Sequence, residues 1–84
     1  MATILTSFKD GQKSTYSPKS VTYYNKRYTV TETPFYDTLA EGWIAEGKDR
    51  KGNLYIIEWK FDLEDLGKDM ADWPWDEPTD VMEV

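Results

Sequence analysis

The stretch that most constrains the fold is residues 42–61, GWIAEGKDRKGNLYIIEWKF. Its two arms, 43–48 and 54–61, are rich in aromatic and β-branched residues and flank the polar segment 49–53, a pattern typical of a β-hairpin. Because side chains alternate between the two faces of a strand, every second residue of the later arm shares one face. These residues are Tyr55, Ile57, Trp59 and Phe61. We predict that this hairpin is the centre of a sheet and that its aromatic face is the core.

A first hairpin is expected near the start of the chain. Residues 2–8 have the composition of a strand, and residues 13–16 supply a second, shorter arm. Between them, Asp10-Gly11 is a strong two-residue turn signal, because glycine accepts the positive φ that such a turn needs.

Another hairpin is predicted with Asn25 and Lys26 as its turn residues. In this register aromatic and branched side chains meet on one face, as cross-strand pairs in a stable sheet do. The pairs on that face are Tyr23 with Tyr28 and Val21 with Val30. The register requires a left-handed conformation at Lys26, which glycine normally supplies; a longer turn would shift the pairing and change the assignment of the faces.

Two short helical segments are expected. Thr33 as N-cap, Pro34 at the first helical position and Gly42 after the end predict a short helix. An irregular crossover between two hairpins is the alternative for the same residues. Later in the chain, Asp62 can cap a single helical turn that Gly67 ends.

Together these elements predict a mostly β fold: a small antiparallel meander or partly closed barrel of five or six strands, with one short helix. An α+β fold with a longer helix is the alternative. We expect one β domain over residues 1–67, followed by an extended acidic arm, residues 68–84, that contains tryptophan and proline. The predicted core consists of Ile4, Phe8, Val21, Tyr23, Tyr28, Val30, Trp43, Tyr55, Ile57, Trp59 and Phe61.

The composition agrees with a small core built from rings. The chain has 84 residues, no cysteine and 15% aromatic residues, so no disulfide stabilises it and large rings must supply most of the buried surface. No apolar run approaches the roughly 18 residues that span a bilayer, and the first residues do not form a signal peptide. We expect a cytoplasmic protein with no membrane partner.

Residues suited to catalysis are scarce. The chain has no histidine and no cysteine, which removes the commonest general base, the commonest nucleophile pairs and the usual zinc ligands. It also has no glycine-rich phosphate loop. Several carboxylates lie close together in sequence, but their spacing is not that of a calcium loop. They are Asp62, Glu64, Asp65 and Asp69. We expect no enzymatic activity, no cofactor and no metal site.

The C-terminal arm is the most distinctive feature for function. Residues 62–84 contain nine acids against Lys68 alone, interleaved with Trp73 and Trp75. One interpretation packs both rings over the exposed part of the sheet, near Tyr24. The other keeps at least one ring for a partner, with the carboxylates steering it towards a basic surface.

The second interpretation predicts a non-enzymatic inhibitor or regulator that binds a protein with a basic surface, such as a nucleic-acid-binding protein. Its predicted partner-binding residues are Asp65, Asp69, Asp72, Trp73, Trp75, Asp76, Glu77 and Asp80. In its length, acidity, aromatic content and lack of cysteine, the chain resembles the small acidic inhibitors that phages use against host defence. Anti-CRISPR and anti-restriction proteins are examples, and some act as nucleic-acid mimics. The resemblance lies in composition and assigns no residue roles.

The alternative function uses the basic first third of the chain. Residues 1–30 contain five cations and one acid, and cations near tyrosine rings suit the binding of single strands on a small β-barrel. The predicted nucleic-acid-binding residues are Lys13, Lys19, Tyr24, Lys26 and Arg27. Lysines beside turns also serve simply as solvated protection of sheet edges.

Overall fold

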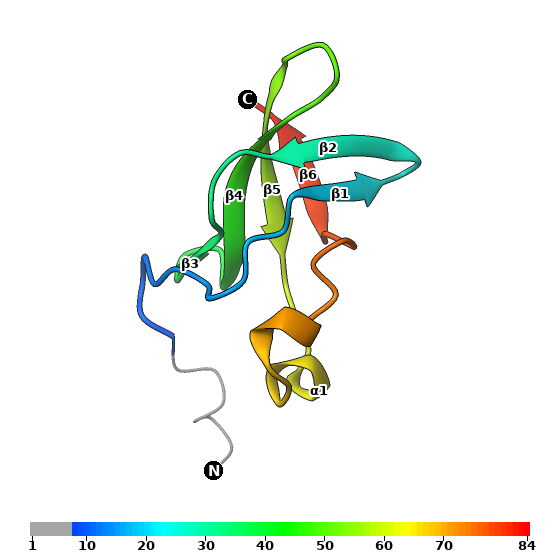
Figure 1. Ribbon diagram of the computed structural model, residues 1–84. Coiled ribbons are helices and arrows are strands. Elements are labelled where there is room, and N and C mark those ends of the chain that lie inside the picture. The colour runs from blue at the N-terminus through cyan, green and yellow to red at the C-terminus, as the bar shows by residue number, and fades with distance from the viewer. Residues whose placement is uncertain (1–7) are drawn as a thin grey trace.

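Six antiparallel strands form one open sheet in the computed structural model, which describes residues 8–84 (Figure 1). Along the sheet the strands are ordered β1-β2-β4-β5-β6, and β3 pairs with β4 beside this path. The strands are β1 (Ser20–Tyr23), β2 (Lys26–Val30), β3 (Phe35–Asp37), β4 (Gly42–Lys48), β5 (Leu54–Trp59) and β6 (Asp80–Glu83). A short helix, α1 (Leu63–Leu66), and a 3-10 turn, η2 (Met70–Asp72), lie between β5 and β6. The prediction of a mostly β fold is confirmed.

The central hairpin forms as predicted. Strands β4 and β5 pair from Trp43 opposite Trp59 to Lys48 opposite Leu54. Asp49 closes the connecting turn, because its Oδ1 accepts hydrogen bonds from the backbone N–H groups of Lys51 and Asn53 at 2.9 Å.

The β1–β2 hairpin forms with a different register. Tyr24 and Asn25 are the turn residues, with φ of 50° and 66°, and Val21 pairs with Tyr28. The predicted turn at Asn25-Lys26 is therefore wrong. Asn25 tolerates the left-handed conformation, and moving the turn back by one residue releases Lys26 from it. The partner of each β1 residue shifts by two positions. Because side chains alternate between faces, a shift of two keeps each residue on its predicted face. The four predicted face residues therefore remain on the core side.

The sheet curls where β2 crosses β4 at Gly47. Val30 pairs with Gly47, and a Cβ atom placed there would lie 2.8 Å from the carbonyl oxygen of Thr29. Only glycine allows this approach. The curl brings β1 towards the last segment of the chain, where the Thr22 N–H donates to the Asp76 carbonyl oxygen at 3.3 Å.

Residues 33–42 do not form the predicted helix. Phe35–Asp37 is strand β3, which pairs with the start of β4. Asp37 favours a turn directly after it, because its Oδ1 accepts from the N–H groups of Leu39 at 2.9 Å and Ala40 at 3.3 Å. Leu39 is 96% exposed and does not contribute to the core.

The first predicted hairpin is only partly described. Its turn is present: Gly11 has a φ of 81°, and the Gln12 N–H donates to the Lys9 carbonyl oxygen at 3.0 Å. Its first arm lies outside the described residues, apart from Phe8. Lys13 forms an isolated bridge with Phe35, so the start of the second arm extends the sheet beside β3.

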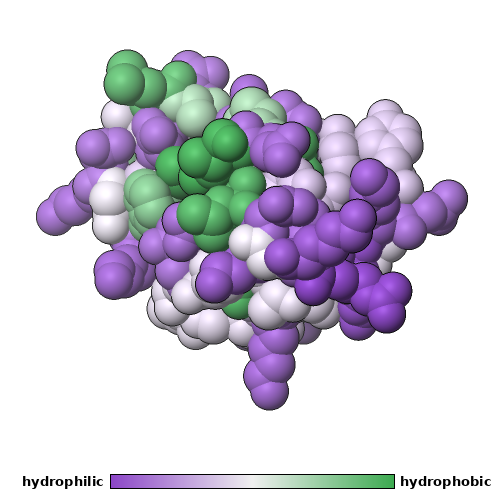
Figure 2. Space-filling model, turned by 90° about the horizontal axis from the view of Figure 1, so that it is seen from above, coloured by the Kyte–Doolittle hydropathy of each residue, from purple (hydrophilic) through white to green (hydrophobic). Residues whose placement is uncertain are grey.

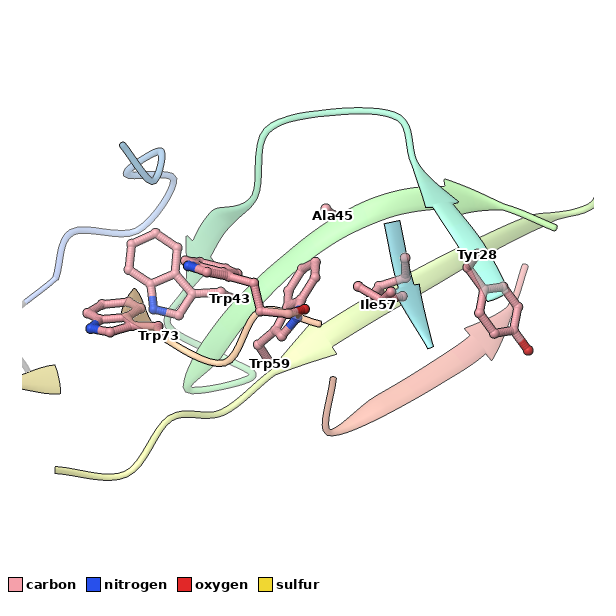
Figure 3. Close-up of a cluster of buried hydrophobic side chains, with 8 residues drawn as sticks. Tyr28, Trp43, Ala45, Ile57, Trp59 and Trp73 are labelled. Carbon is pink, nitrogen blue, oxygen red and sulfur yellow. Dashed lines mark hydrogen bonds between the residues drawn. The ribbon is translucent and has the colours of Figure 1, made fainter. Parts of the chain in front are cut away.

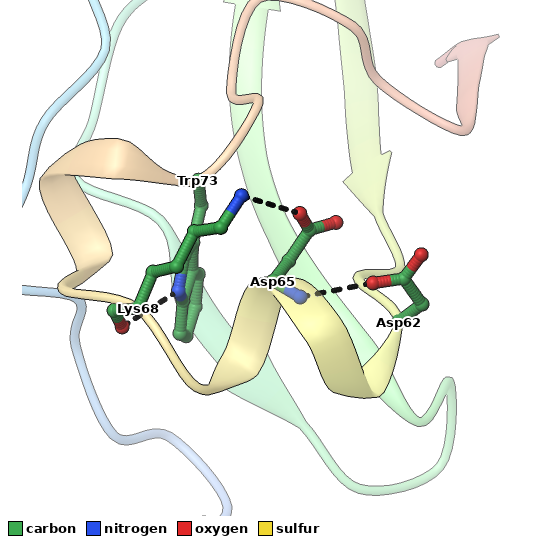
Figure 4. A network of polar contacts seen from close by, with 4 residues as sticks. All are labelled: Asp62, Asp65, Lys68 and Trp73. Carbon is green, nitrogen blue, oxygen red and sulfur yellow. Dashed lines mark hydrogen bonds and ion pairs between the residues drawn. The ribbon is translucent and has the colours of Figure 1, made fainter.

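Helix α1 follows the predicted capping pattern (Figure 4). The side chain of Asp62 accepts a hydrogen bond from the Asp65 N–H at 2.9 Å, and Gly67 is the C-cap. Within residues 8–84, no helix combines the length and the apolar character that crossing a membrane requires.

The core occupies one face of the sheet (Figure 3). Each predicted core residue within 8–84 is buried or packs against the buried cluster; Ile4 lies outside the described residues. Three residues of the buried hydrophobic cluster were not in the predicted core: Ala45, Trp73 and Trp75.

Candidate functional site

Trp73 and Trp75, proposed above as partner contacts, are buried within the monomer. Their side chains are 5% and 2% exposed. The Trp75 ring lies 5.2 Å from that of Trp59, and the Trp73 ring lies 4.8 Å from that of Phe61, measured between centroids. The expectation that at least one ring stays free for a partner is wrong. The other interpretation correctly buries the rings but places them on the wrong face, because they pack on the core side, whereas Tyr24 is 84% exposed.

Hydrogen bonding explains why these rings belong to the core. A buried indole N–H is costly unless it finds an acceptor. The Trp75 Nε1 donates to the Met70 carbonyl oxygen at 2.6 Å, and the Trp73 Nε1 donates to the Lys68 carbonyl oxygen at 3.1 Å (Figure 4). The Trp59 Nε1 in turn donates to the Trp75 carbonyl oxygen at 2.6 Å. Residues 68–75 thus supply both the rings and the acceptors that their burial requires.

Carboxylates of the predicted partner-binding set divide into two groups. Asp69, Asp72, Asp76 and Glu77 are exposed. Asp69 and Asp72 flank η2 close to α1, whereas the carbonyl of Asp76 accepts from the Thr22 N–H of β1. Asp65 and Asp80 are half-buried, and each contacts another side chain. Asp65 lies 3.9 Å from the Lys68 Nζ, and Asp80 accepts from the Tyr23 hydroxyl at 3.3 Å.

A basic cleft lies at the opposite end of the sheet. It has a volume of about 600 Å³ and opens between the tip of the β1–β2 hairpin and the 49–53 turn. Figure 2 looks down on this end and shows hydrophilic side chains gathered beside a smaller hydrophobic group. Four cations line the cleft, together with the single carboxylate of Asp49. These cations are Lys26, Arg27, Arg50 and Lys51.

Within residues 8–84, none of these four cations forms an ion pair with a carboxylate, although Asp49 shares the lining of the cleft. In the part of the chain that the structure describes, the one ion pair joins Lys68 to Asp65, at the other end of the molecule. An anion that enters the cleft therefore meets positive charge that is not already paired. A further carboxylate, Glu83 on β6, pairs with Tyr55 of the cleft lining.

The lining of the cleft also includes two tyrosine rings. Tyr28 and Tyr55 meet edge to face with centroids 4.9 Å apart. The Tyr55 hydroxyl donates to the Asp49 Oδ2 at 3.0 Å, and Asp49 also accepts from the Asn53 side chain at 2.9 Å. That Asn53 bond is the main reason why the pKa of Asp49 falls from 3.8 to about 2. The bond to Asp49 in turn raises the pKa of Tyr55 to about 12.

Of the predicted nucleic-acid-binding residues, the structure brings some together and separates others. Lys26 and Arg27 line the cleft, and Tyr24 directly precedes this part of its lining. Lys13 lies beside β3, and Lys19 lies at the end of β1 away from the hairpin tip. Neither lines the cleft.

Arg50 and Lys51 were missed as site residues. They stand in the turn of the central hairpin. Residues 31–61 as a whole contain more acids than cations, so the net charge of this region does not reveal the two adjacent cations. The signal that could have identified them is local: two adjacent cations in a tight turn have little besides solvent to contact.

Tyr24 occupies an unusual backbone position. Its φ of 50° lies in the left-handed region, where a residue with a side chain costs roughly 1–2 kcal/mol relative to its ordinary conformations. Such turns strongly favour asparagine, aspartate or glycine. A bulky ring in this position is an outlier.

Among residues 8–84, no group of three or more acidic side chains is arranged to hold a metal ion. No protein-family model, curated protein or solved structure matches this chain.

Proposed function

We propose that this protein is a non-enzymatic binding protein that takes the phosphate backbone of a nucleic acid into its basic cleft. The observation that carries the proposal is the convergence of four unpaired cations from two hairpins around one concave site. Unpaired cations bind phosphates largely by releasing condensed counterions. Concavity lets several of them act on the same ligand.

The acidic net charge does not prevent this binding. Strand β5 has six residues and spans about 20 Å, and it separates the 49–53 turn from the carboxylates on and directly after α1. Asp76 and Glu83 lie nearer to the cleft, beside β1 and opposite Tyr55. Charges separated by the length of β5 are largely screened at physiological ionic strength, where the Debye length is about 8 Å. A ligand in the cleft therefore responds mainly to the local cations.

The proposal is tested by measuring the affinity of the full chain for a labelled single-stranded oligonucleotide across a salt series. Binding should be weak, with a dissociation constant of about 10⁻⁴ to 10⁻⁶ M at physiological salt. Replacing one cleft cation, as in Arg50→Gln or Lys26→Gln, should lower the affinity and reduce the salt slope by about 0.7.

Matched controls come from the same chain. Lys13→Gln and Lys19→Gln remove the same charge away from the cleft and should leave affinity and slope unchanged. Equal losses in the controls and the cleft variants, or no binding by the natural chain at low salt, would contradict the proposal.

A second candidate function is the one that the acidic composition suggests: inhibition of a partner with a basic surface, such as a cytoplasmic nucleic-acid-binding protein. The exposure of four carboxylates in the segment between α1 and β6 favours it. These are Asp69, Asp72, Asp76 and Glu77. Without an exposed tryptophan, such binding would depend on charge alone.

A quadruple amide variant, with Asp69→Asn, Asp72→Asn, Asp76→Asn and Glu77→Gln, separates the two functions. It keeps both buried rings and the cleft. If the acidic end is the binding surface, the variant should lose affinity for polylysine and keep its affinity for the oligonucleotide. Unchanged polylysine binding would remove this candidate.

A further inference from the structure

The further inference concerns Tyr24, the exposed ring at the tip of the β1–β2 hairpin. It is 84% exposed and stands in a left-handed turn that asparagine or glycine would occupy more easily. Folding gains little from this ring, because most of its surface remains in water. A strained and exposed residue is a reason to look for a functional role.

The ring is held in a defined orientation. It meets the Tyr23 ring edge to face, with centroids 4.6 Å apart and an angle of 82° between planes. Tyr23 is half-buried, and its hydroxyl donates to Asp80 at 3.3 Å. Tyr24 therefore rests on a neighbour that is fixed to the opposite edge of the sheet, and this contact limits the side-chain freedom that is lost on binding.

The position of Tyr24 in the chain also relates it to the cleft, although its ring is not part of the cleft lining. Residues 25–28 line the cleft, and Tyr24 directly precedes them. A strand that leaves the cleft past Lys26 therefore meets the hairpin tip that carries Tyr24.

We propose that Tyr24 is a stacking platform for a nucleobase, and that the ligand of the cleft is single-stranded nucleic acid. This inference rests on the function proposed above and specifies its ligand. Bases in a single strand can turn away from one another and stack on an aromatic ring, whereas those of a duplex are already stacked. Every base has a flat face, so binding is expected to tolerate most sequences.

The test compares three labelled probes: an oligothymidylate of about twelve nucleotides, an abasic strand of the same length, and a duplex. Tyr24→Asn is the informative variant, because asparagine suits the turn and the fold should be retained, which a thermal melt checks. It should lower affinity for the oligothymidylate by about 5- to 150-fold. It should leave affinity for the abasic strand and the duplex unchanged.

Tyr24→Phe is the matched control, because it keeps the ring and removes only the hydroxyl. It should bind the oligothymidylate as the natural chain does. Equal binding by Tyr24→Asn and the natural chain would overturn the stacking role while leaving the phosphate-binding cleft intact. An equal loss on the abasic strand would also overturn it. Failure of the natural chain to bind any of the three probes would overturn the proposed function itself.

Discussion

Two regions of this protein mix aromatic rings with charges, and they use the rings in opposite ways. In the acidic segment 68–77 the tryptophans are buried and the carboxylates are left outside. At the β1–β2 hairpin tip the Tyr24 ring is outside and the neighbouring cations line a cleft. A ring beside charges therefore does not by itself mark a binding surface. The difference lies in whether the fold offers the ring a dry face and its polar atom an acceptor.

The largest expected effect comes from deleting a buried ring of the acidic segment. Trp75→Ala should lower the free energy of unfolding by about 3–5 kcal/mol, which is much of the stability of a domain this small. Urea denaturation followed by circular dichroism measures the loss. The nearby exposed substitution Asp72→Asn should stay within about 0.5 kcal/mol of the natural chain. A similarly small effect of Trp75→Ala would show that the ring is not core.

The polar lining of the cleft should show a pH-dependent effect. The folded-state pKa of Asp49 lies near 2, below its usual 3.8. A lowered pKa contributes stability that is present above pH 3.8 and lost as the pH falls towards 2. Between pH 4 and pH 2, the free energy of unfolding should fall less steeply in Asp49→Asn than in the natural chain. Equal slopes would mean that Asp49 forms no such hydrogen bonds in solution.

At the hairpin tip, removal of the ring should raise the free energy of unfolding, whereas removal of the Trp75 ring should lower it. Tyr24→Asn relieves a left-handed strain of about 1–2 kcal/mol and gives up a contact with Tyr23 of about 0.5–1.5 kcal/mol. We expect a small net stabilisation of about 0.5 kcal/mol. Thermal denaturation monitored by circular dichroism checks it, and a loss of more than about 1 kcal/mol would mean that Tyr24 belongs to the folding core.

The smallest effect is expected for the ion pair of the acidic segment. Lys68→Ala removes the contact with Asp65 at 3.9 Å but keeps the backbone carbonyl that accepts from Trp73. Because Lys68 is exposed and the two charged atoms lie as far as 3.9 Å apart, the free energy of unfolding should change by no more than about 0.5 kcal/mol. A larger loss in urea denaturation would assign the stability of this segment to charge as well as to its rings.

Local patterns in the sequence predicted most of the sheet. Alternation from Tyr55 to Phe61 correctly gave the core face, and Asp62 with Gly67 correctly gave the bounds of α1. These predictions succeeded because the residues that form the pattern in the sequence are the same residues that form the strand or the helix. The turn at Tyr24-Asn25 failed because a tyrosine in a left-handed position goes against local preference.

The candidate site was harder to predict because it depends on long-range contacts. Trp75 is buried through a carbonyl at Met70 and a ring at Trp59, which no local pattern shows. Arg50 joins Lys26 only because two hairpins of the same sheet bring their tips together around one cleft. Charge summed along the sequence emphasised the acidic segment and concealed this cluster.

The most direct test of the account is a two-dimensional NMR titration of the labelled full chain with a single-stranded oligonucleotide. The account predicts shift changes confined to the cleft and the hairpin tip, with the backbone amides of residues 62–77 unaffected. The amides expected to move include those of Tyr24, Lys26, Arg27, Arg50 and Lys51. Changes centred on residues 62–77, or no changes at saturating oligonucleotide, would contradict it.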